Sequence, residues 1–469
     1  MSSLRIGILA IGVLAAAGCV HYQPSPLNPT LQLGEYRARR LDDSTLLAWV
    51  ERWTGHISPA GWTDRQLAVA ALKLRAELPR ARADWRTAKA GERSAGGRPQ
   101  PGVSADVERA VSGSKGQSPW VVALAGLLSL ELGGKRGARM QEARARAAVA
   151  EADLTIVAWR TVMATRQAVL HLTLADSARQ LASVELAGTI EVAGLERERF
   201  AESAVLASEL YRTEAEVEVV RSAAAAAERD LIEARGSLAG ALGVPPRSID
   251  SIAVAPARSA GCKRLDALGM DSLQAVALVA RPEIARSLAE YAIAEAQVKL
   301  RVAKQYPDLD LGPGFIWDQG VHRWTVALAL PGLLAFRNRA PIVESETARG
   351  AAGARVLETQ ESVLRELALA GERCRGAQVM RAAADSQMAT AARNLARARA
   401  TYGRGESTKL DGALAGLAVI RAGHARRDAE RDLMLAGWSL EVAAGEWGGT
   451  EAVRWPDPRD ENGEEGTPQ

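Results

Sequence analysis

Two short segments of the chain alternate between apolar residues and polar or small residues. In the segment 307–331 the apolar side chains recur at every second position, as Leu309, Leu311, Pro313, Phe315 and Trp317 before the turn sequence DQGVH, and as Trp324, Val326, Leu328 and Leu330 after it. A period of two places alternate side chains on opposite faces of a strand. The pattern therefore predicts a β-hairpin with one apolar face.

A second, weaker hairpin is predicted over 101–132. Its apolar positions are Val103, Ala105 and Val107 before the turn sequence SGSKGQS, and Trp120, Val122 and Leu124 after it. The two hairpins together would supply four strands, which leave two unpaired edges. Proteins avoid exposing such edges.

Helical periodicity surrounds both hairpins. One helix is predicted before each hairpin, over 64–97 and 272–304, and two long helices after each, over 137–182 and 187–242, then over 340–385 and 388–445. A helix of about 45 residues reaches roughly 70 Å. Helices of this length without internal caps indicate coiled-coil or helical-tube packing.

The same order of elements occurs twice because the chain is an internal repeat. The segment Ala71–Trp85 aligns with Ala277–Tyr291 without a gap, and further along the chain Glu209 aligns with Asp411. Repeats of this kind decide the fold before any single element does. We therefore expect a first repeat over 64–243, a linker over 244–271 and a second repeat over 272–445.

The chain ends have separate compositions. Residues 1–18 resemble a signal peptide, and the following Cys19 completes a lipobox-like sequence, AAGC, so we expect Cys19 to be lipidated and to begin a lead over 19–63. An ordinary signal peptide with an incidental cysteine is the alternative. The residues 446–469 are rich in Pro, Gly and acidic residues, which predicts a disordered tail.

Charge and composition exclude some functions. The 59 basic and 56 acidic residues are mixed throughout, so the clustered basic stripe that nucleic-acid binding needs is missing, and no nucleic-acid partner is expected. No histidine has ligand spacing with another His or Cys, and His322 falls at the predicted hairpin turn. Phosphate-loop and nucleophile-elbow motifs do not occur, so we expect no enzyme, no cofactor and no metal site.

The cysteines Cys262 and Cys374 stand apart from any metal-binding or redox motif. A disulfide is compatible with an oxidising compartment, but sequence cannot show that two cysteines are close. We therefore favour two isolated small apolar residues.

The four strands allow two interpretations. The apolar face bears Trp120, Trp317 and Trp324 near strand ends, as aromatic belts do at membrane interfaces. In a membrane the strands would have to belong to a closed barrel completed by further chains. The alternative is a small soluble β-subdomain packed on the helices. Asp308 and Asp310 share the other face, which suits a water-filled pore better than acid–base catalysis.

At this point the sequence resembles the outer-membrane efflux factors, the TolC-like family, over about 64–445. The resemblance rests on the paired repeats, on ARPEIARSLAEYAIAEAQVKLRVAKQYPDLDL before the third strand, on LPGLLAFRNRAPIVESETAR after the fourth, and on TYGRGESTKLDGALAGLAVIRA, which is similar to the family's equatorial element. Phe336-Arg337-Asn338-Arg339 is most similar to the branch that serves heavy-metal cation pumps.

The resemblance implies a mainly α-helical fold with a small β part. Long periplasmic helices would form an α-barrel, and four strands per subunit would contribute to a 12-stranded outer-membrane β-barrel of a homotrimer. The protein would be a lipid-anchored, passive exit duct for small molecules or metal ions, with a periplasmic adaptor and an inner-membrane pump as partners. A periplasmic adaptor or a structural helical lipoprotein is the alternative, although adaptors carry only one helical hairpin.

The chain departs from the family near the expected periplasmic tip. Some members carry acidic residues there, whereas this chain has Arg393, Arg397 and Arg399 in ARNLARARATY. The first repeat has glutamates, including Glu191 and Glu196, before its equivalent turn. We expect Arg–Glu pairing between repeats or between subunits to hold the tip, with an ordinary solvated helix face as the alternative.

Overall fold

The computed structural model describes residues 22–109, 111, 118–257, 259, 261–331, 339–447 and 455–459. The chain divides into two compact units, Met1–Arg40 and Leu41–Gln469. The described part of the first unit holds the helix α2 (Pro29–Ala38), whose residues are all exposed. Its N-cap Asn28 accepts a hydrogen bond from the N–H group of Thr30 at 3.1 Å.

The second unit contains one order of elements twice. The first copy comprises α4 (Asp64–Leu74), α5 (Glu77–Ala95), β1 (Gly102–Arg109), β2 (Trp120–Leu130), α6 (Lys135–Ala201) and α7 (Ala207–Leu242). The second comprises α9 (Met270–Ala280), α10 (Pro282–Ala303), β3 (Leu309–Asp318), β4 (Val321–Ala329), α11 (Arg339–Gly403) and α12 (Lys409–Ala443). Outside the copies lie α3 (Ser44–Thr54), the 3-10 helix η1 (Pro246–Ser248) and α8 (Gly261–Leu268).

Each helix predicted before a hairpin is in fact two helices. The segment 64–97 breaks before α5, where Pro79 lies in the first turn, has no N–H to donate and would clash with the carbonyl four residues earlier. The segment 272–304 breaks at Arg281, which is extended (φ −72°, ψ 118°) because the following Pro282 disfavours helical dihedrals there. The single-helix predictions were wrong because they gave these prolines no weight.

The long helices turn later in the chain than predicted. α6 has 67 residues and α11 has 65, so each is about 100 Å long. The predicted breaks at 183–186 and 386–387 were wrong, because neither segment contains a glycine or proline. The real turns contain left-handed residues, Ser203 (φ 59°) in the first copy and Gly405 (φ 76°) in the second.

The four strands form one antiparallel sheet in the order β1-β2-β3-β4. Both predicted hairpins are confirmed, as β1–β2 and β3–β4. The central pair joins the two copies, with Leu124 of β2 opposite Phe315 of β3. Phe315 in turn lies opposite Trp324 of β4.

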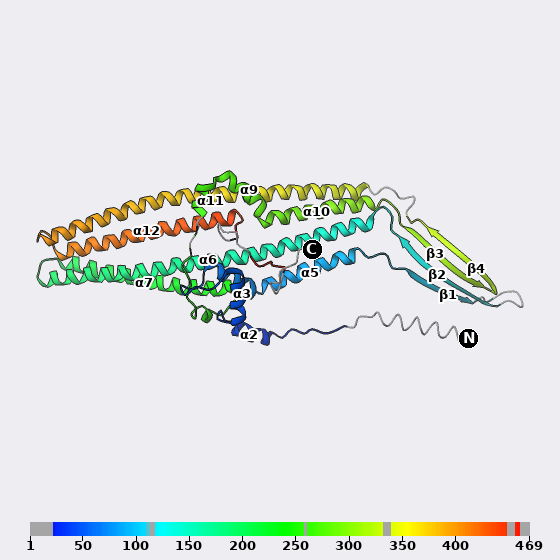
Figure 1. Cartoon of the computed structure of the whole chain (residues 1–469), viewed down its shortest axis with the longest axis horizontal. Helices are drawn as coiled ribbons and strands as arrows, with labels where there is room; N and C mark the ends of the chain where they lie inside the picture. Colours follow the sequence, from blue (N-terminus) through cyan, green and yellow to red (C-terminus); the bar gives the residue numbers. More distant parts are fainter. Residues whose placement is uncertain are drawn as a thin grey trace. The chain divides into compact units, whose positions relative to one another are not determined.

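Four helices adjoin the sheet in the same order as its strands. α5 leads into β1, β2 leads into α6, α10 leads into β3, and β4 precedes α11. α5 packs on α6, α6 on α10, and α10 on α11. Figure 1 shows that the α6–α7 and α11–α12 turns lie at the opposite end of these helices from the sheet.

Two buried clusters hold the helices together. The first gathers Leu67, Leu154 and Leu238 from α4, α6 and α7. The second gathers Leu367 and Leu440 from α11 and α12, with further residues of α8 to α10. The linker predicted over 244–271 is thus not an extended connection, because it contains η1 and α8 and packs into this core.

A disulfide lies within the second cluster. It joins Cys262 of α8 to Cys374 of α11, whose Cα atoms are 5.4 Å apart, and both residues are buried. The preference for two isolated cysteines was wrong. The residues are 112 positions apart in sequence, so only the packing of α8 against α11 brings them together. Such bonds are typical of chains that fold in an oxidising compartment.

Two equivalent arginines cap the last helix of each copy. Arg75 follows α4 and donates to the carbonyl oxygen of Gly240 in α7 at 3.0 Å. Arg281 follows α9 and donates to the carbonyl oxygen of Val442 in α12 at 3.2 Å. The last carbonyl groups of a helix lack partners within it, and a cation near them is also favoured by the helix dipole. The repeat therefore extends to individual side-chain contacts.

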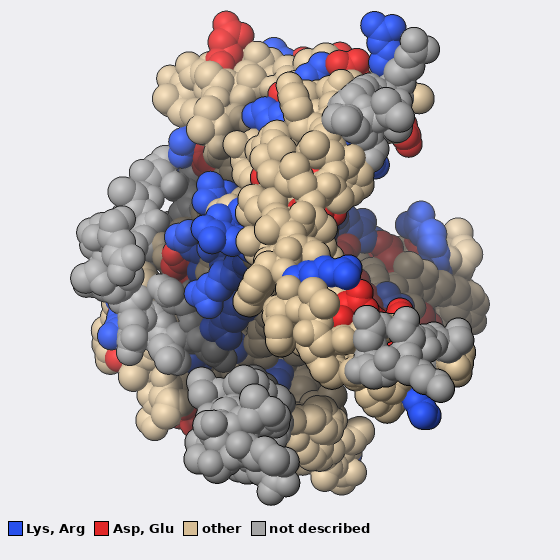
Figure 2. Space-filling view, turned by 90° about the vertical axis from the view of Figure 1, so that its right-hand side faces the viewer, with Lys and Arg blue, Asp and Glu red and all other residues tan. Residues whose placement is uncertain are grey.

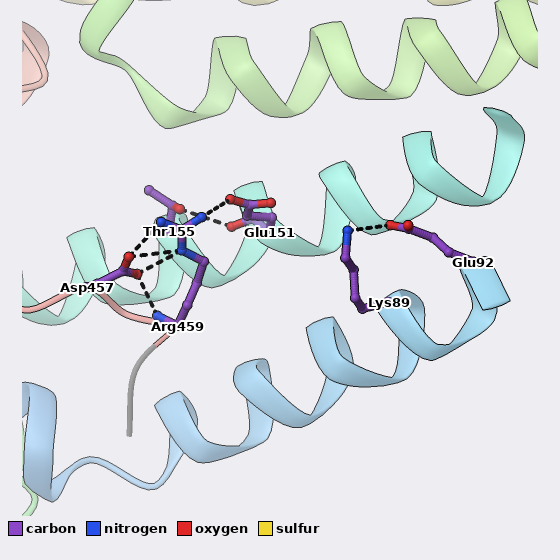
Figure 3. Close-up of polar contacts among 6 residues, drawn as sticks. All are labelled: Lys89, Glu92, Glu151, Thr155, Asp457 and Arg459. Atoms are coloured by element: carbon purple, nitrogen blue, oxygen red, sulfur yellow. Dashed lines mark hydrogen bonds and ion pairs between the residues drawn. The ribbon is translucent and has the colours of Figure 1, made fainter. Parts of the chain in front are cut away.

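Part of the tail is ordered. Arg459 donates to Glu151 of α6 at 2.9 Å and pairs with Asp457 at 2.6 Å (Figure 3). Pro458 accepts a hydrogen bond from Arg82 of α5 at 2.6 Å. The prediction of a disordered tail was therefore wrong for 455–459, because specific polar contacts offset the unfavourable composition there. Residues 448–454 and 460–469 lie outside the described residues.

Candidate functional site

One face of the sheet is almost entirely apolar across all four strands. The register aligns the alternating positions of neighbouring strands, so this face carries Val103, Ala105 and Val107 of β1, Val122, Leu124 and Leu128 of β2, Leu311, Phe315 and Trp317 of β3, and Trp324, Val326 and Leu328 of β4. His322 lies on the same face as the second residue of β4, where its ring stacks on Phe315 at 5.7 Å. It is thus a strand residue and not the predicted turn residue.

The opposite face is mainly small and polar. Ser129 of β2 donates to Asp310 of β3 at 2.5 Å on this face. Gly314 lies beside Thr325, where an added Cβ would come within 2.5 Å of the Thr325 hydroxyl oxygen. The sheet therefore separates an apolar surface from a polar one, as the alternation predicts.

Both edges of the sheet are open in the described chain. β1 and β4 each have one neighbour, and every residue of these two strands is exposed. An edge strand presents unpaired backbone donors and acceptors. Trp324, which is 84% exposed, belongs to such an edge. Further strands would satisfy the two edges, and an apolar environment would cover the apolar face.

The tryptophans mark one end of the apolar face. Trp120 begins β2, Trp317 is the next-to-last residue of β3, and Trp324 follows the β3–β4 turn. All three lie at the end of the sheet that points away from the helices in Figure 1. This is the arrangement expected of an aromatic belt. None of the described helices has an apolar stretch long enough to cross a membrane.

The predicted tip arginines lie on α11, close to its end. Arg393, Arg397 and Arg399 are all exposed, and Arg393 donates to the hydroxyl of Thr390 at 2.9 Å. Within the described part of the chain none of the three forms an ion pair. Within the described chain these arginines therefore do not join the two repeats, and pairing between subunits or an ordinary solvated helix face remains for them.

Other residues join the two copies near this end. Arg421 of α12 contacts Glu216 of α7 and lies 3.4 Å from Glu185 of α6, and His424 Nε2 lies 2.9 Å from Glu185. A small apolar cluster that includes Leu417 lies beside them. Sequence reasoning missed these pairs, because each spans more than two hundred positions and no local spacing signals it.

The segment that resembled the family's equatorial element, 401–422, forms the α11–α12 turn and the start of α12. The equatorial interpretation was wrong. Here Thr408 is the N-cap of α12, and its backbone N–H donates to Asp411 at 2.8 Å. The aligned Glu209 of the first copy accepts from the N–H of Leu206 at 3.3 Å. The repeat thus preserves one half of a capping box at both turns.

We expect the turn between α11 and α12 to be sensitive to pH because of the Asp411 carboxyl. Hydrogen bonds from the Thr408 backbone and hydroxyl lower the pKa of Asp411 below the ordinary value of an aspartate. A carboxyl whose pKa is lower in the folded chain stabilises the fold above its unfolded pKa, and this contribution is lost as the pH falls through the folded pKa. We expect amide hydrogen exchange at the start of α12, corrected for intrinsic rates, to accelerate below about pH 4.

The Asp411→Asn variant is the matched control. Asn keeps an acceptor for the Thr408 N–H but does not titrate, so the acceleration should disappear. Equal acceleration in Asp411→Asn and the unmodified chain would contradict the assignment.

Two predicted sites cannot be placed. Cys19 and the residues Phe336 to Asn338 lie outside the described residues. Among the described residues, no group of three or more His, Cys, Asp or Glu side chains is placed to hold a metal ion.

Several solved structures of outer-membrane proteins are similar to this chain. VceC, an outer membrane protein of Vibrio cholerae, is similar over 82% of this chain and 96% of its own, with a TM-score of 0.65 and 19% identity. The outer-membrane channel OprN matches over 92% and 99%, with a TM-score of 0.65 and 18% identity. The chain has the TolC-like outer-membrane channel fold.

A further solved channel has the same fold. The CmeC outer membrane channel of Campylobacter jejuni matches 91% of this chain and 94% of its own, with a TM-score of 0.63 and 16% identity. No protein-family model matches the sequence, and no curated protein matches it either. The TolC-like fold is therefore recognised through structure, together with the repeat and the strand pattern that carried the resemblance.

Proposed function

We propose that the chain is a subunit of an outer-membrane exit duct in a tripartite efflux system. The observation that carries this proposal is the open four-stranded sheet, with one apolar face and two unpaired edges, at the end of a layer of four helices. A barrel closed by further copies would pair both edges and direct the apolar face to lipid. A soluble β-subdomain would leave that face exposed.

Three copies give a consistent assembly. Three sheets of four strands make a 12-stranded barrel, within the range of outer-membrane barrels. The polar face with Asp310 would then line the water-filled interior. The long helices would continue as a tube into the periplasm, and the duct itself would have no catalytic step.

The location is supported by two independent features. The Cys262–Cys374 disulfide suits the oxidising periplasm. The N-terminal sequence suits export and lipidation of Cys19, with the mature chain anchored in the outer membrane. The chain would be a lipoprotein that both inserts its strands and carries its own acyl anchor.

Substitution of neighbouring residues on β4 tests the membrane assignment. Val326→Arg places a charge on the proposed lipid face and should cost about 2–4 kcal/mol if it lies near the midplane. We expect the sodium dodecyl sulfate-resistant oligomer to be lost from outer membranes, as measured by heat-modifiable migration. Thr325→Arg, on the other face, is the matched control and should leave the oligomer intact. Equal behaviour of the two variants would contradict the assignment.

The tip arginines lead to a second proposal. In the trimer, α11 would lie beside α7 of the next subunit, where Glu202 of the α6–α7 turn and Glu209 of α7 are exposed. Arg393, Arg397 and Arg399 would pair with such acids across the subunit boundary and hold the entrance narrow. Pairs of this kind are weak singly and are screened by salt, so they can be released.

Single-channel recording tests the tip pairing. Arg393→Ala combined with Arg397→Ala should raise the resting conductance at low salt, and the difference should shrink as salt rises. Arg355→Ala combined with Arg365→Ala changes exposed arginines elsewhere on α11 and is the control. Unchanged conductance of the tip variant would overturn the pairing.

The partners would be a periplasmic adaptor and an inner-membrane pump. A metal-cation cargo rests on the sequence Phe336-Arg337-Asn338-Arg339 alone. Export assays with monovalent copper and with a hydrophobic dye, run with a candidate pump and adaptor, would separate metal from drug cargo.

A further inference from the structure

We propose that six basic side chains at the helix–strand junctions form a collar that binds anionic phospholipid headgroups at the periplasmic surface of the membrane. The basic collar consists of Arg98, Arg136, Lys299, Arg301, Lys304 and Arg339. The proposal rests on the outer-membrane assignment above and adds the chemistry of the lipid that the duct prefers.

The topology places the collar at one level of the chain. Arg98 lies between α5 and β1, and Arg136 is the second residue of α6. Arg301 lies in the last turn of α10, Lys299 lies just before that turn, and Lys304 is the C-cap, shortly before β3. Arg339 begins α11. All four helix ends adjoin the sheet (Figure 1). The apolar face starts a few residues away, so the collar lies just outside the proposed lipid layer.

The collar has few acidic neighbours. Between the helix ends and the strands the described acidic residues Glu131 and Asp308 are both paired, Asp308 with Lys135 at 2.7 Å and Glu131 with Arg139, whereas Glu344 and Glu346 lie beyond the first turn of α11. All six collar residues are exposed, and within the described chain none of them forms an ion pair. Elsewhere on the helices, pairs such as Arg381–Asp385 are frequent.

Helix stability does not explain the whole collar. Cations in the last turn of α10 are favoured by the helix dipole. Arg136 and Arg339 lie instead in the first turns of α6 and α11, where the dipole favours acids, and neither first turn contains one. Arg136 also donates to the carbonyl oxygen of Gly96, the C-cap of α5, at 2.7 Å, whereas Arg339 lowers the stability of α11 unless an anion lies close by.

Headgroup phosphates provide that anion. A phosphate diester accepts hydrogen bonds from guanidinium and ammonium groups, and basic residues beside a membrane attract anionic lipids by about fivefold each. Figure 2 views the chain from the sheet end and shows Lys and Arg side chains gathered more densely than Asp and Glu. Phosphatidylglycerol, which carries a net negative charge, fits this surface better than zwitterionic phosphatidylcholine.

Lipid titration of the purified full-length oligomer tests the collar. Bound phosphatidylglycerol and phosphatidylcholine are counted by native mass spectrometry at low salt. The variant Lys299→Gln, Arg301→Gln, Lys304→Gln should lose its preference for phosphatidylglycerol by about a hundredfold. The control Arg355→Gln, Arg365→Gln, Arg373→Gln removes the same number of exposed charges from the middle of α11 and should keep the preference.

Two results would overturn the collar. One is an equal lipid preference in the collar variant and the unmodified oligomer. The other is a change of ion selectivity in planar bilayers without any change in lipid binding, which would place these cations on the interior of the duct. Arg136→Gln with Arg339→Gln repeats the test if the first variant does not assemble. Only variants that form the resistant oligomer are compared, so failure of the barrel is recognised separately.

Discussion

Removing the Cys262–Cys374 disulfide is expected to lower the free energy of unfolding by about 4–5 kcal/mol. The bond closes a loop of 112 positions, and the loss of chain entropy in the unfolded state grows with the length of such a loop. Both cysteines are buried in the cluster that joins α8 to α11. The bond therefore fastens the linker between the repeats to the longest helix of the second repeat.

The measurement is urea unfolding followed by the helical circular dichroism signal. Cys262→Ala with Cys374→Ala should show the lower midpoint, and the unmodified chain in reductant should unfold at nearly the same concentration. The expectation would be contradicted if the unmodified chain unfolded at the same urea concentration with and without reductant. The disulfide would then be absent or without effect on the global transition.

Arg281→Ala is expected to cost about 2–3 kcal/mol, because it removes a buried guanidinium that makes charge-assisted hydrogen bonds. The side chain is 7% exposed and pairs with Glu283 and Glu366, both at 3.1 Å. It also donates to the carbonyl oxygen of Val442 at 3.2 Å and lies over the ring of Trp159. Its loss removes the side-chain donor from the C-terminal end of α12.

The repeat supplies a matched control in Arg75. Arg75→Ala removes the equivalent cap on α7, but the side chain is 24% exposed and water can replace it, so about 1 kcal/mol is expected. Arg281→Lys keeps the charge without the forked geometry and should fall between the two. Equal destabilisation by Arg75→Ala and Arg281→Ala, measured by the same unfolding experiment, would show that burial of Arg281 does not matter.

The alternation of apolar and polar residues predicted the strands and their faces well, because this pattern is local in the sequence. A period of two assigns each strand residue to a face, and the short β3–β4 turn fixes the register, so Phe315 and Trp324 meet on one face. The pairing of β2 with β3 is long-range, and no local pattern predicts it. The candidate membrane surface could therefore be drawn from the sequence almost residue by residue.

Other features have a weaker local signal or none. Pro79 and Pro282 mark the helix breaks, and Gly405 with the Thr408–Asp411 cap marks the second turn. The first turn has Leu206 at its N-cap, which offers no acceptor, and only its alignment with the second turn reveals it. The disulfide depends on packing across 112 positions and has no sequence signal.

The most direct test of the duct is conductance of the purified protein in planar lipid bilayers. The account predicts a sodium dodecyl sulfate-resistant trimer that inserts and gives discrete steps of ionic current, with Thr325→Arg still active and Val326→Arg unable to insert. A protein that stays monomeric, or that binds bilayers without any current steps, would contradict the account.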